Sequence, residues 1–110
     1  MKLPHSDQAL ILVDKLEGYS LNPSHSEGRH KAVVFQTALG LGLEHAEELR
    51  SALRQAAQTE EAIPTQQNVY GQKYQIDFTM TRGNKSAIIR SIWIVRRNED
   101  FPRLVTCYIP

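Results

Sequence analysis

The chain has 110 residues, of which 41% are hydrophobic, and its 13 Lys and Arg against 12 Asp and Glu leave a formal net charge of +1. This balance is typical of one globular domain spanning 1–110, and it excludes a disordered chain and a second domain. No apolar run approaches the length of a membrane span and no secretory signal is visible, so we expect no membrane partner. Cys107 is the only cysteine, as is common in the reducing cytoplasm, the location we predict.

Short elements are expected at the start of the chain. Residues 9–13, Ala-Leu-Ile-Leu-Val, favour a short strand. Asp14 is placed to cap a short helix over 15–20. The following Leu-Asn-Pro ends that helix and begins a polar loop over 22–30.

Two longer helices are predicted next. Apolar residues near helical spacing predict a helix over 31–39, which Gly40 ends. The clearest helix covers 44–57, where apolar residues form one stripe: Ala46, Leu49, Leu53 and Ala56. Each helix therefore has a face suited to a core.

The second half of the chain favours strands. Residues 58–68 are polar and contain Pro64, so we predict a loop there. Val69 and Tyr70 are candidates for a short additional strand. Apolar and polar residues alternate over 74–80, which predicts a strand buried on one face.

A tight turn is predicted at 82–85, because Gly and Asn tolerate positive φ. Residues 87–95 are apolar on both faces except at Arg90 and Ser91, which indicates a central strand, and 104–109 form the next strand. The expected fold is therefore α+β, with N-terminal helices packed on a C-terminal antiparallel sheet of about four strands.

The loop before the 31–39 helix is the most unusual stretch for chemistry. It places His25, Arg29, His30 and Lys31 within seven residues. A histidine exchanges protons near neutral pH, and a nearby cation stabilises a developing phosphorane-like charge. These groups suit metal-independent RNA cleavage, in which a base activates the 2′-hydroxyl. The alternative is a structural loop, in which Asn22 caps and His25 anchors the loop through backbone hydrogen bonds.

Positive charge gathers in the strand half. Residues 71–110 hold seven Lys and Arg against three acids, a net +4, whereas residues 1–70 hold six against nine, a net −3. Such asymmetry indicates either a phosphate-binding surface or charged turns that keep sheet edges soluble. Arg90 interrupts an apolar strand and needs a partner, either an acid such as Asp77 or a substrate phosphate. Thr106 and Tyr108 share one strand face, where their hydroxyls contact a phosphate or bond across the sheet.

Motifs for metals and cofactors are absent from the sequence. His25 and His30 have no zinc-site spacing around them, and there is no HExxH or CxxC. Neither a dinucleotide-binding nor a phosphate-loop glycine motif occurs. We therefore predict no metal and no cofactor.

Spaced residues across the chain resemble a bacterial domain family of unknown function. They are an LNPxHxxGxxKAxxF segment from Leu21 to Phe35, preceded by Lys15, Leu16 and Tyr19, and later pieces at Tyr70, Gly71, Tyr74, Arg90, Ser91, Trp93, Ile94, Pro102, Arg103, Leu104 and Thr106. Stand-alone members are small bacterial proteins, and related domains occur in phage and polymorphic-toxin settings. The expected order of helices and strands also resembles the barnase–EndoU–colicin–RelE group of metal-independent ribonucleases.

The second resemblance implies roles for the candidate residues. His25 would be the general base or acid, while Lys31 and Arg90 would stabilise the transition-state charge. Thr106 would position the phosphate together with Tyr108, and Asn22, Arg29 and His30 are further candidates for substrate binding. The predicted function is thus a ribonuclease or toxin-like domain acting on RNA. The alternative is a non-catalytic module that binds a small cognate protein, such as an immunity or antitoxin protein.

Overall fold

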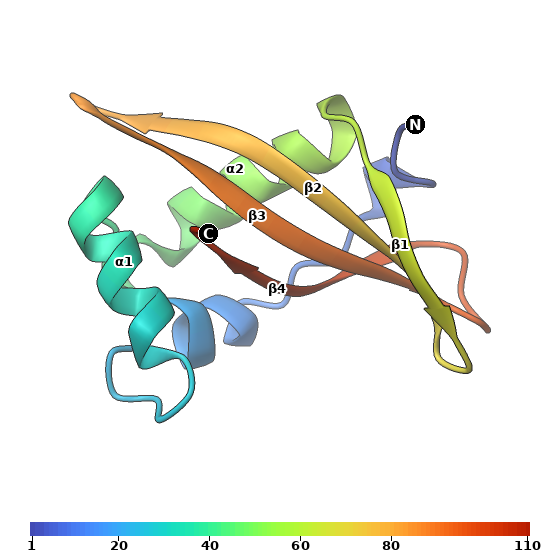
Figure 1. The fold of residues 1–110 in the computed structure, drawn as a ribbon, viewed down its shortest axis with the longest axis horizontal. Helices are drawn as coiled ribbons and strands as arrows, with labels where there is room; N and C mark the ends of the chain where they lie inside the picture. Colours follow the sequence, from blue (N-terminus) through green and yellow to red (C-terminus); the bar gives the residue numbers. More distant parts are fainter.

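Four strands and two helices make up most of the computed structural model, which describes residues 1–110. The helices are α1 (Arg29–Leu39) and α2 (Ala46–Thr59), and the strands are β1 (Ile63–Asn68), β2 (Gly71–Arg82), β3 (Lys85–Arg96) and β4 (Pro102–Tyr108). The strands form one antiparallel sheet in the order β1-β2-β3-β4 (Figure 1). The predicted α+β fold is therefore confirmed.

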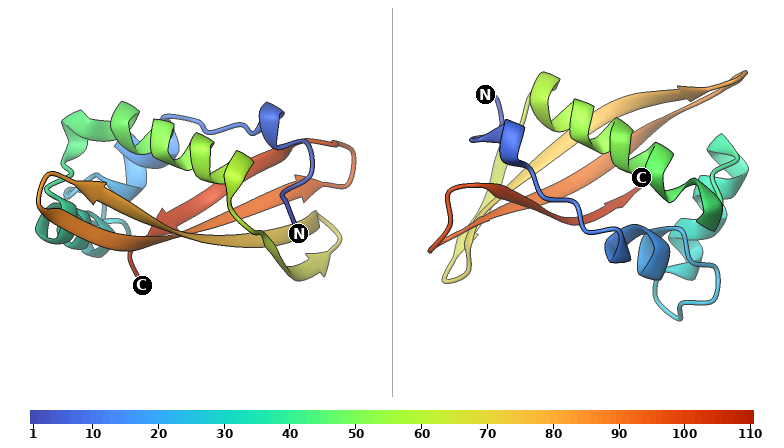
Figure 2. Two further views of the ribbon diagram at one scale, coloured as in Figure 1. Left: turned by 90° about the horizontal axis from the view of Figure 1, so that it is seen from above. Right: turned by 180° about the vertical axis from the view of Figure 1, so that it is seen from behind.

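One face of the sheet packs against the helices. Figure 2 shows α2 and the N-terminal segment lying along this face, with α1 beside one end of the sheet. Alternate residues of β2 point into the core, as the period-two pattern predicts: Tyr74, Ile76, Phe78 and Met80. They pack with the buried stripe of α2, which includes Leu49 and Leu53.

A hydrogen-bonded polar chain lies in the core beneath β2 and β3. Trp93 is fully buried on β3, and its indole Nε1 donates to Ser91 Oγ at 2.9 Å. Ser91 Oγ in turn donates to the backbone oxygen of Ile76 at 2.8 Å. Both buried polar groups are thus satisfied, as burial requires.

The other face of the sheet carries the alternating side chains that do not enter the core, and we call it the open face. It includes Lys73 and Asp77 of β2, Ile88, Arg90, Ile92 and Ile94 of β3, and Arg103, Thr106 and Tyr108 of β4. The prediction that β3 is central is confirmed by its position between β2 and β4. Its second apolar face is only partly buried, and Ile88 is 54% exposed.

Strand β1 corrects the predicted loop over 58–68. Residues 63–68 pair with β2, whereas Val69 and Tyr70, expected to be a strand, form the turn between them. The side chains of β1 are almost all exposed, so no alternation marks it in the sequence. An edge strand also tolerates Pro64, because one side of its backbone lacks a partner.

The segment 9–13 is also different from its prediction. Only Leu10 bridges to Arg103 of β4, where Leu10 N donates to Pro102 O and Leu104 N to Leu10 O, both at 2.9 Å. The chain then leaves the sheet and buries Ile11 in the core. A π-helical turn follows at Leu16–Ser20, and no side chain caps it, so the predicted cap at Asp14 is wrong.

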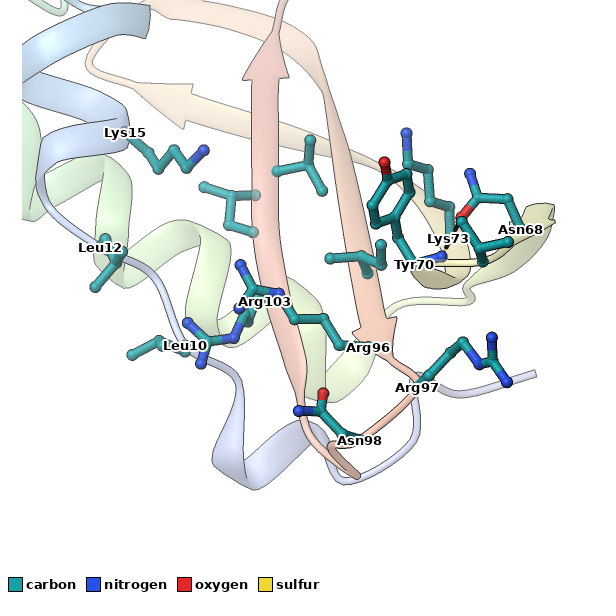
Figure 3. Close-up of a pocket in the computed structure, with 14 residues that line it drawn as sticks. Leu10, Leu12, Lys15, Asn68, Tyr70, Lys73, Arg96, Arg97, Asn98 and Arg103 are labelled. Carbon is teal, nitrogen blue, oxygen red and sulfur yellow. Dashed lines mark hydrogen bonds between the residues drawn. The ribbon is translucent and has the colours of Figure 1, made fainter.

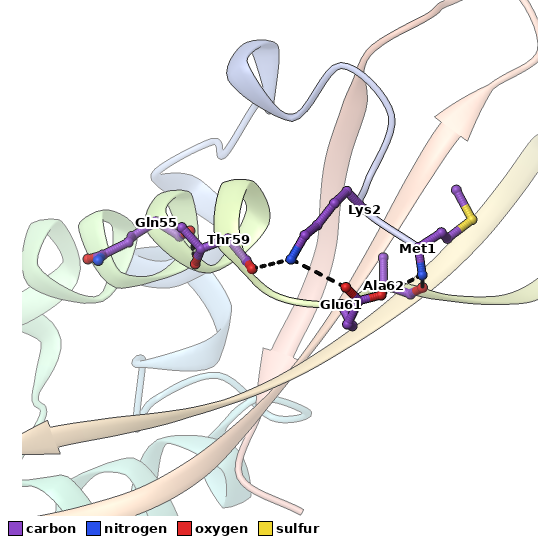
Figure 4. Close-up of polar contacts among 6 residues, drawn as sticks. All are labelled: Met1, Lys2, Gln55, Thr59, Glu61 and Ala62. Carbon is purple, nitrogen blue, oxygen red and sulfur yellow. Dashed lines mark hydrogen bonds and ion pairs between the residues drawn. The ribbon is translucent and has the colours of Figure 1, made fainter.

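The N-terminus is attached to the end of α2 (Figure 4). Lys2 Nζ donates to Thr59 O at 2.5 Å, where a cation complements the carbonyl end of the helix. Glu61 pairs with the Met1 amino group and with Lys2, and these two cations hold the pKa of its carboxyl below the usual value. No helix of the structure has both the length and the apolar composition needed to cross a membrane.

Candidate functional site

Lys31 lies at the centre of the candidate site. Its Nζ donates to Thr106 Oγ1 at 3.0 Å and to the Tyr19 hydroxyl at 3.5 Å. The same ammonium lies 4.6 Å from the ring centroid of Tyr19 and 5.2 Å from that of Tyr108. Two aromatic faces and two hydroxyls hold this cation, which makes no ion pair with Asp or Glu. Its charge is therefore available to an anionic ligand.

Three separate segments supply these side chains. Tyr19 comes from the turn at Leu16–Ser20, Lys31 from the first turn of α1, and Thr106 from β4. Gly28 allows the turn and the helix to approach, because a Cβ there would lie 2.2 Å from the backbone oxygen of Tyr19. Any larger residue at 28 would separate Tyr19 from Lys31.

A β-bulge in β4 aims the two hydroxyls at the site. Leu104 pairs with Trp93 and Thr106 with Ile92, so Val105 is an extra residue in the ladder. Without the bulge, strict alternation from buried Leu104 would direct Thr106 into the core. The extra residue instead places Thr106 on the open face together with Tyr108.

Arg90 and Asp77 form an ion pair beside Tyr108. The guanidinium contacts both carboxylate oxygens at 3.0 Å, and Arg90 is the cross-strand neighbour of Tyr108. The carboxylate of Asp77, followed by the hydroxyl of Tyr108, raises the pKa of Arg90 above its usual value. The predicted acidic partner is thus the one observed. The pair leaves Lys31 as the uncompensated charge of the cluster.

His25 caps the turn that leads into α1, whose own N-cap residue, Gly28, has no side-chain hydrogen bond. Its Nδ1 accepts the backbone N–H groups of Glu27 and Gly28, both at 3.0 Å, and helical bonding begins when Arg29 N donates to His25 O at 2.9 Å. Helix N-caps use the same arrangement, in which one side-chain acceptor takes the second and third N–H groups that follow it. Because Nδ1 is occupied, the proton of the neutral imidazole lies on Nε2. The ring also packs edge-on against Tyr19, with centroids 4.8 Å apart.

These contacts predict different results for two substitutions of His25. We expect His25→Ala to lower the free energy of unfolding by about 1–2 kcal/mol, the usual cost of losing an N-cap. His25→Asn keeps an acceptor at the cap and is expected to melt close to wild type. Thermal melts measured by circular dichroism check both values.

Activity of the same two variants separates capping from proton transfer. If His25 only caps, His25→Asn retains the RNA cleavage predicted from the sequence. If the imidazole transfers a proton, both variants lose cleavage although His25→Asn keeps its stability. Equal melting of His25→Ala and wild type would contradict the capping role.

The other candidate residues lie outside the Lys31 cluster. Asn22 Oδ1 accepts the N–H of Ser24 at 2.9 Å, which is a local turn contact. Arg29 and His30 are exposed on the first turn of α1, and neither side chain makes a hydrogen bond or ion pair. Arg29 places positive charge near Lys31, but neither residue contacts the partners of Lys31.

Tyr19 is the site residue that sequence reasoning left without a role. It sits in a short polar turn with no periodicity, and only its place in the quoted family pattern marks it. Cys107 is buried behind the site, and burial raises the pKa of its thiol to about 12, so it is protonated near neutral pH and a poor nucleophile. No three His, Cys, Asp or Glu side chains gather closely enough to hold a metal ion.

Comparison with known proteins places the chain in a family. Residues 2–110 match a family described as a domain of unknown function (DUF6883), and the chain belongs to it. No curated protein matches the sequence significantly. A similar solved structure is a chain of a contact-dependent growth inhibition toxin–immunity protein complex from Klebsiella pneumoniae 342. It has a TM-score of 0.64 and 18% identity, over 94% of this chain and 95% of that one, which shows a shared fold.

Proposed function

We propose that this member of the DUF6883 family is a ribonuclease of the toxin-like kind, which cleaves RNA by attack of a 2′-oxygen on the adjacent phosphorus. One observation carries the proposal. The ammonium of Lys31 has no acidic partner and is held among hydroxyls at the junction of α1 and β4. A half-buried cation in such a setting suits a phosphodiester, whose charge rises in the transition state.

Each neighbour has a role toward that phosphate. Lys31 contacts the non-bridging oxygens, and the hydroxyls of Thr106 and Tyr108 donate to the same group from the sheet. Arg90, held by Asp77, offers further guanidinium N–H donors on the open face next to Tyr108. Donors already fixed in place stabilise developing charge without a cost of reorganisation during the reaction.

The proposed reaction is a transesterification that consumes no water. The 2′-oxygen forms a bond to phosphorus while the bond from phosphorus to the 5′-oxygen breaks, which leaves a 2′,3′-cyclic phosphate and a 5′-hydroxyl. One proton leaves the 2′-hydroxyl and one proton reaches the 5′-oxygen. The reaction therefore needs proton transfer but consumes no co-reactant. In this proposal the proton of the 2′-hydroxyl passes through solvent water to the 5′-oxygen. The Nε2–H of His25 can donate a hydrogen bond to the phosphate but cannot accept this proton, because Nδ1 accepts the backbone N–H groups of Glu27 and Gly28.

Binding of a small cognate protein is the second candidate function. The Klebsiella structure of the same fold contains a toxin together with its immunity protein. A toxin-like domain of this chain would need an equivalent immunity or antitoxin partner in its host. Such a partner is compatible with a ribonuclease and would also suit a module without activity.

The direct test uses a short labelled RNA with EDTA present. We expect wild-type protein to cut it into fragments that end in 2′,3′-cyclic phosphates. The same oligonucleotide with 2′-deoxy sugars is the matched control and is expected to stay intact, since it lacks the nucleophile. Intact RNA at excess protein, or equal cutting of the deoxy control, would refute the proposed reaction.

A further inference from the structure

A basic groove lies at the opposite end of the open face from Lys31. It has a volume of about 640 Å³ and is bounded by the segment 10–15, the turn between β1 and β2, and strands β3 and β4 (Figure 3). Five cationic side chains line it: Lys15, Lys73, Arg96, Arg97 and Arg103. No acidic residue lines it, and only Arg103 is neutralised, by Glu99 at 2.8 Å. Four uncompensated cations therefore surround one depression.

Exposed apolar side chains stand among these cations. Tyr70 is 73% exposed and Val69 is 68% exposed, both in the turn between β1 and β2. An exposed aromatic ring next to Lys and Arg is the combination with which proteins bind single-stranded nucleic acid, where bases stack and phosphates are neutralised. Neither residue contributes to the core, so the fold itself does not explain them.

The groove is continuous with the Lys31 site. Arg90 and Ile94 lie on the same face of β3, four residues apart, which is about 13 Å along a strand. Arg90 is next to Tyr108 of the site, and Ile94 is next to both Lys73 and Arg103 of the groove. An extended nucleic-acid strand bound at the Lys31 site can therefore reach the groove while it stays on the open face of the sheet.

We infer that the groove binds the RNA strand that flanks the cleaved linkage, with Lys73, Arg96 and Arg97 on phosphates and Tyr70 under a base. This inference rests on the proposed function and adds a second contact region for the same substrate. An acidic protein would meet the same charges, but it would not use a stacking ring or require the continuity with a phosphate site.

The first test measures binding without cleavage. The probe is a fluorescent RNA with every 2′-hydroxyl methylated, titrated with protein at several salt concentrations. We expect Lys73→Gln/Arg96→Gln to bind at least about tenfold more weakly, and to reduce the slope of log K against log salt by about 1.4, since each phosphate contact on a single strand contributes about 0.7. Tyr70→Ala is expected to bind about 5- to 150-fold more weakly through lost stacking.

The matched control removes two charges far from the groove. Lys2→Gln/Lys85→Gln changes two lysines that bond backbone carbonyls at Thr59 and Thr37, and it is expected to keep the wild-type slope. Unchanged affinity and slope in the groove variants would overturn the inference. So would a loss of equal size in the control, because it would show only a net-charge effect. Weaker binding of polyglutamate by the groove variants, with unchanged RNA binding, would assign the groove to an acidic protein instead.

Cleavage of two substrates separates this inference from the proposed reaction. A dinucleotide spans Lys31 but is too short for the groove. We expect the groove variants to cut the dinucleotide like wild type. On the longer RNA we expect kcat/KM to fall at least about tenfold, because these variants bind the flanking strand that much more weakly. Failure of wild type to cut either RNA would refute the reaction alone. Cleavage of both RNAs by the groove variants at wild-type rates would refute the groove alone.

Discussion

Lys31→Met is expected to lower the rate of RNA cleavage by about 10²–10³-fold, the usual effect of removing one preorganised donor to a transition-state oxygen. Methionine keeps most of the aliphatic stem and removes the ammonium that lies over the rings of Tyr19 and Tyr108. The measurement is single-turnover cleavage at saturating protein, which reports the chemical step separately from binding.

Stability of the Lys31→Met variant shows whether the loss is chemical. The bonds of Lys31 to Thr106 and Tyr19 are only partly buried, so we expect the free energy of unfolding to change by no more than about 1 kcal/mol. Lys85→Met, which removes one charge at the turn between β2 and β3, is the matched control and is expected to retain activity. Wild-type cleavage by Lys31→Met would exclude Lys31 from the mechanism.

Trp93→Ala is expected to give the largest loss of stability in the chain, about 3–5 kcal/mol. Trp93 is fully buried and is the only tryptophan. Its removal leaves a cavity between sheet and helices and takes away the donor to Ser91. Domains of this size have about 5–15 kcal/mol in total, so this loss is a substantial fraction. The corresponding fall in Tm is at least about 12 °C.

Two further substitutions on β3 test the cause. Trp93→Phe retains an aromatic ring and is expected to lose less than Trp93→Ala. Ile88→Ala changes the open face of the same strand, where the side chain is 54% exposed, and is expected to stay within about 0.5 kcal/mol of wild type. Circular dichroism in denaturant is the suitable measurement, because the Trp93 variants lack tryptophan fluorescence. A loss at Ile88 equal to that at Trp93 would contradict this assignment of the two faces.

The two faces of the sheet thus differ: one face forms the core, and the other carries the candidate site and the groove. Side chains directed toward α2 make up the core, whereas those on the open face include Arg90, Thr106 and Tyr108 of the site and Lys73 of the groove. The core face supplies the apolar surface against which the helices and the N-terminal segment pack. The open face leaves a long surface of charged, hydroxyl and apolar side chains on which an extended substrate can lie.

Local patterns in the sequence were sufficient for most of the fold. Period-two alternation located β2, helical spacing located α2, and a run that is apolar on both faces except at Arg90 and Ser91 located β3 as the central strand. Such periodicities arise because one face of each element is buried. β1 was missed for the same reason, since a strand exposed on both faces has no such pattern. The need of Arg90 for a partner was also evident from the sequence, and Asp77 provides it.

Only the tertiary structure decided how the candidate residues meet. Lys31 and Thr106 are 75 positions apart and become neighbours through the approach of α1 to β4. The extra residue Val105 directs Thr106 outward, and a single-residue register shift leaves no signature in composition. The sequence also did not show which way the His25 ring points, because a histidine that caps a turn and a histidine that transfers protons look the same in a sequence. Sequence determines which groups are present and which faces are apolar; long-range packing determines which groups share a site.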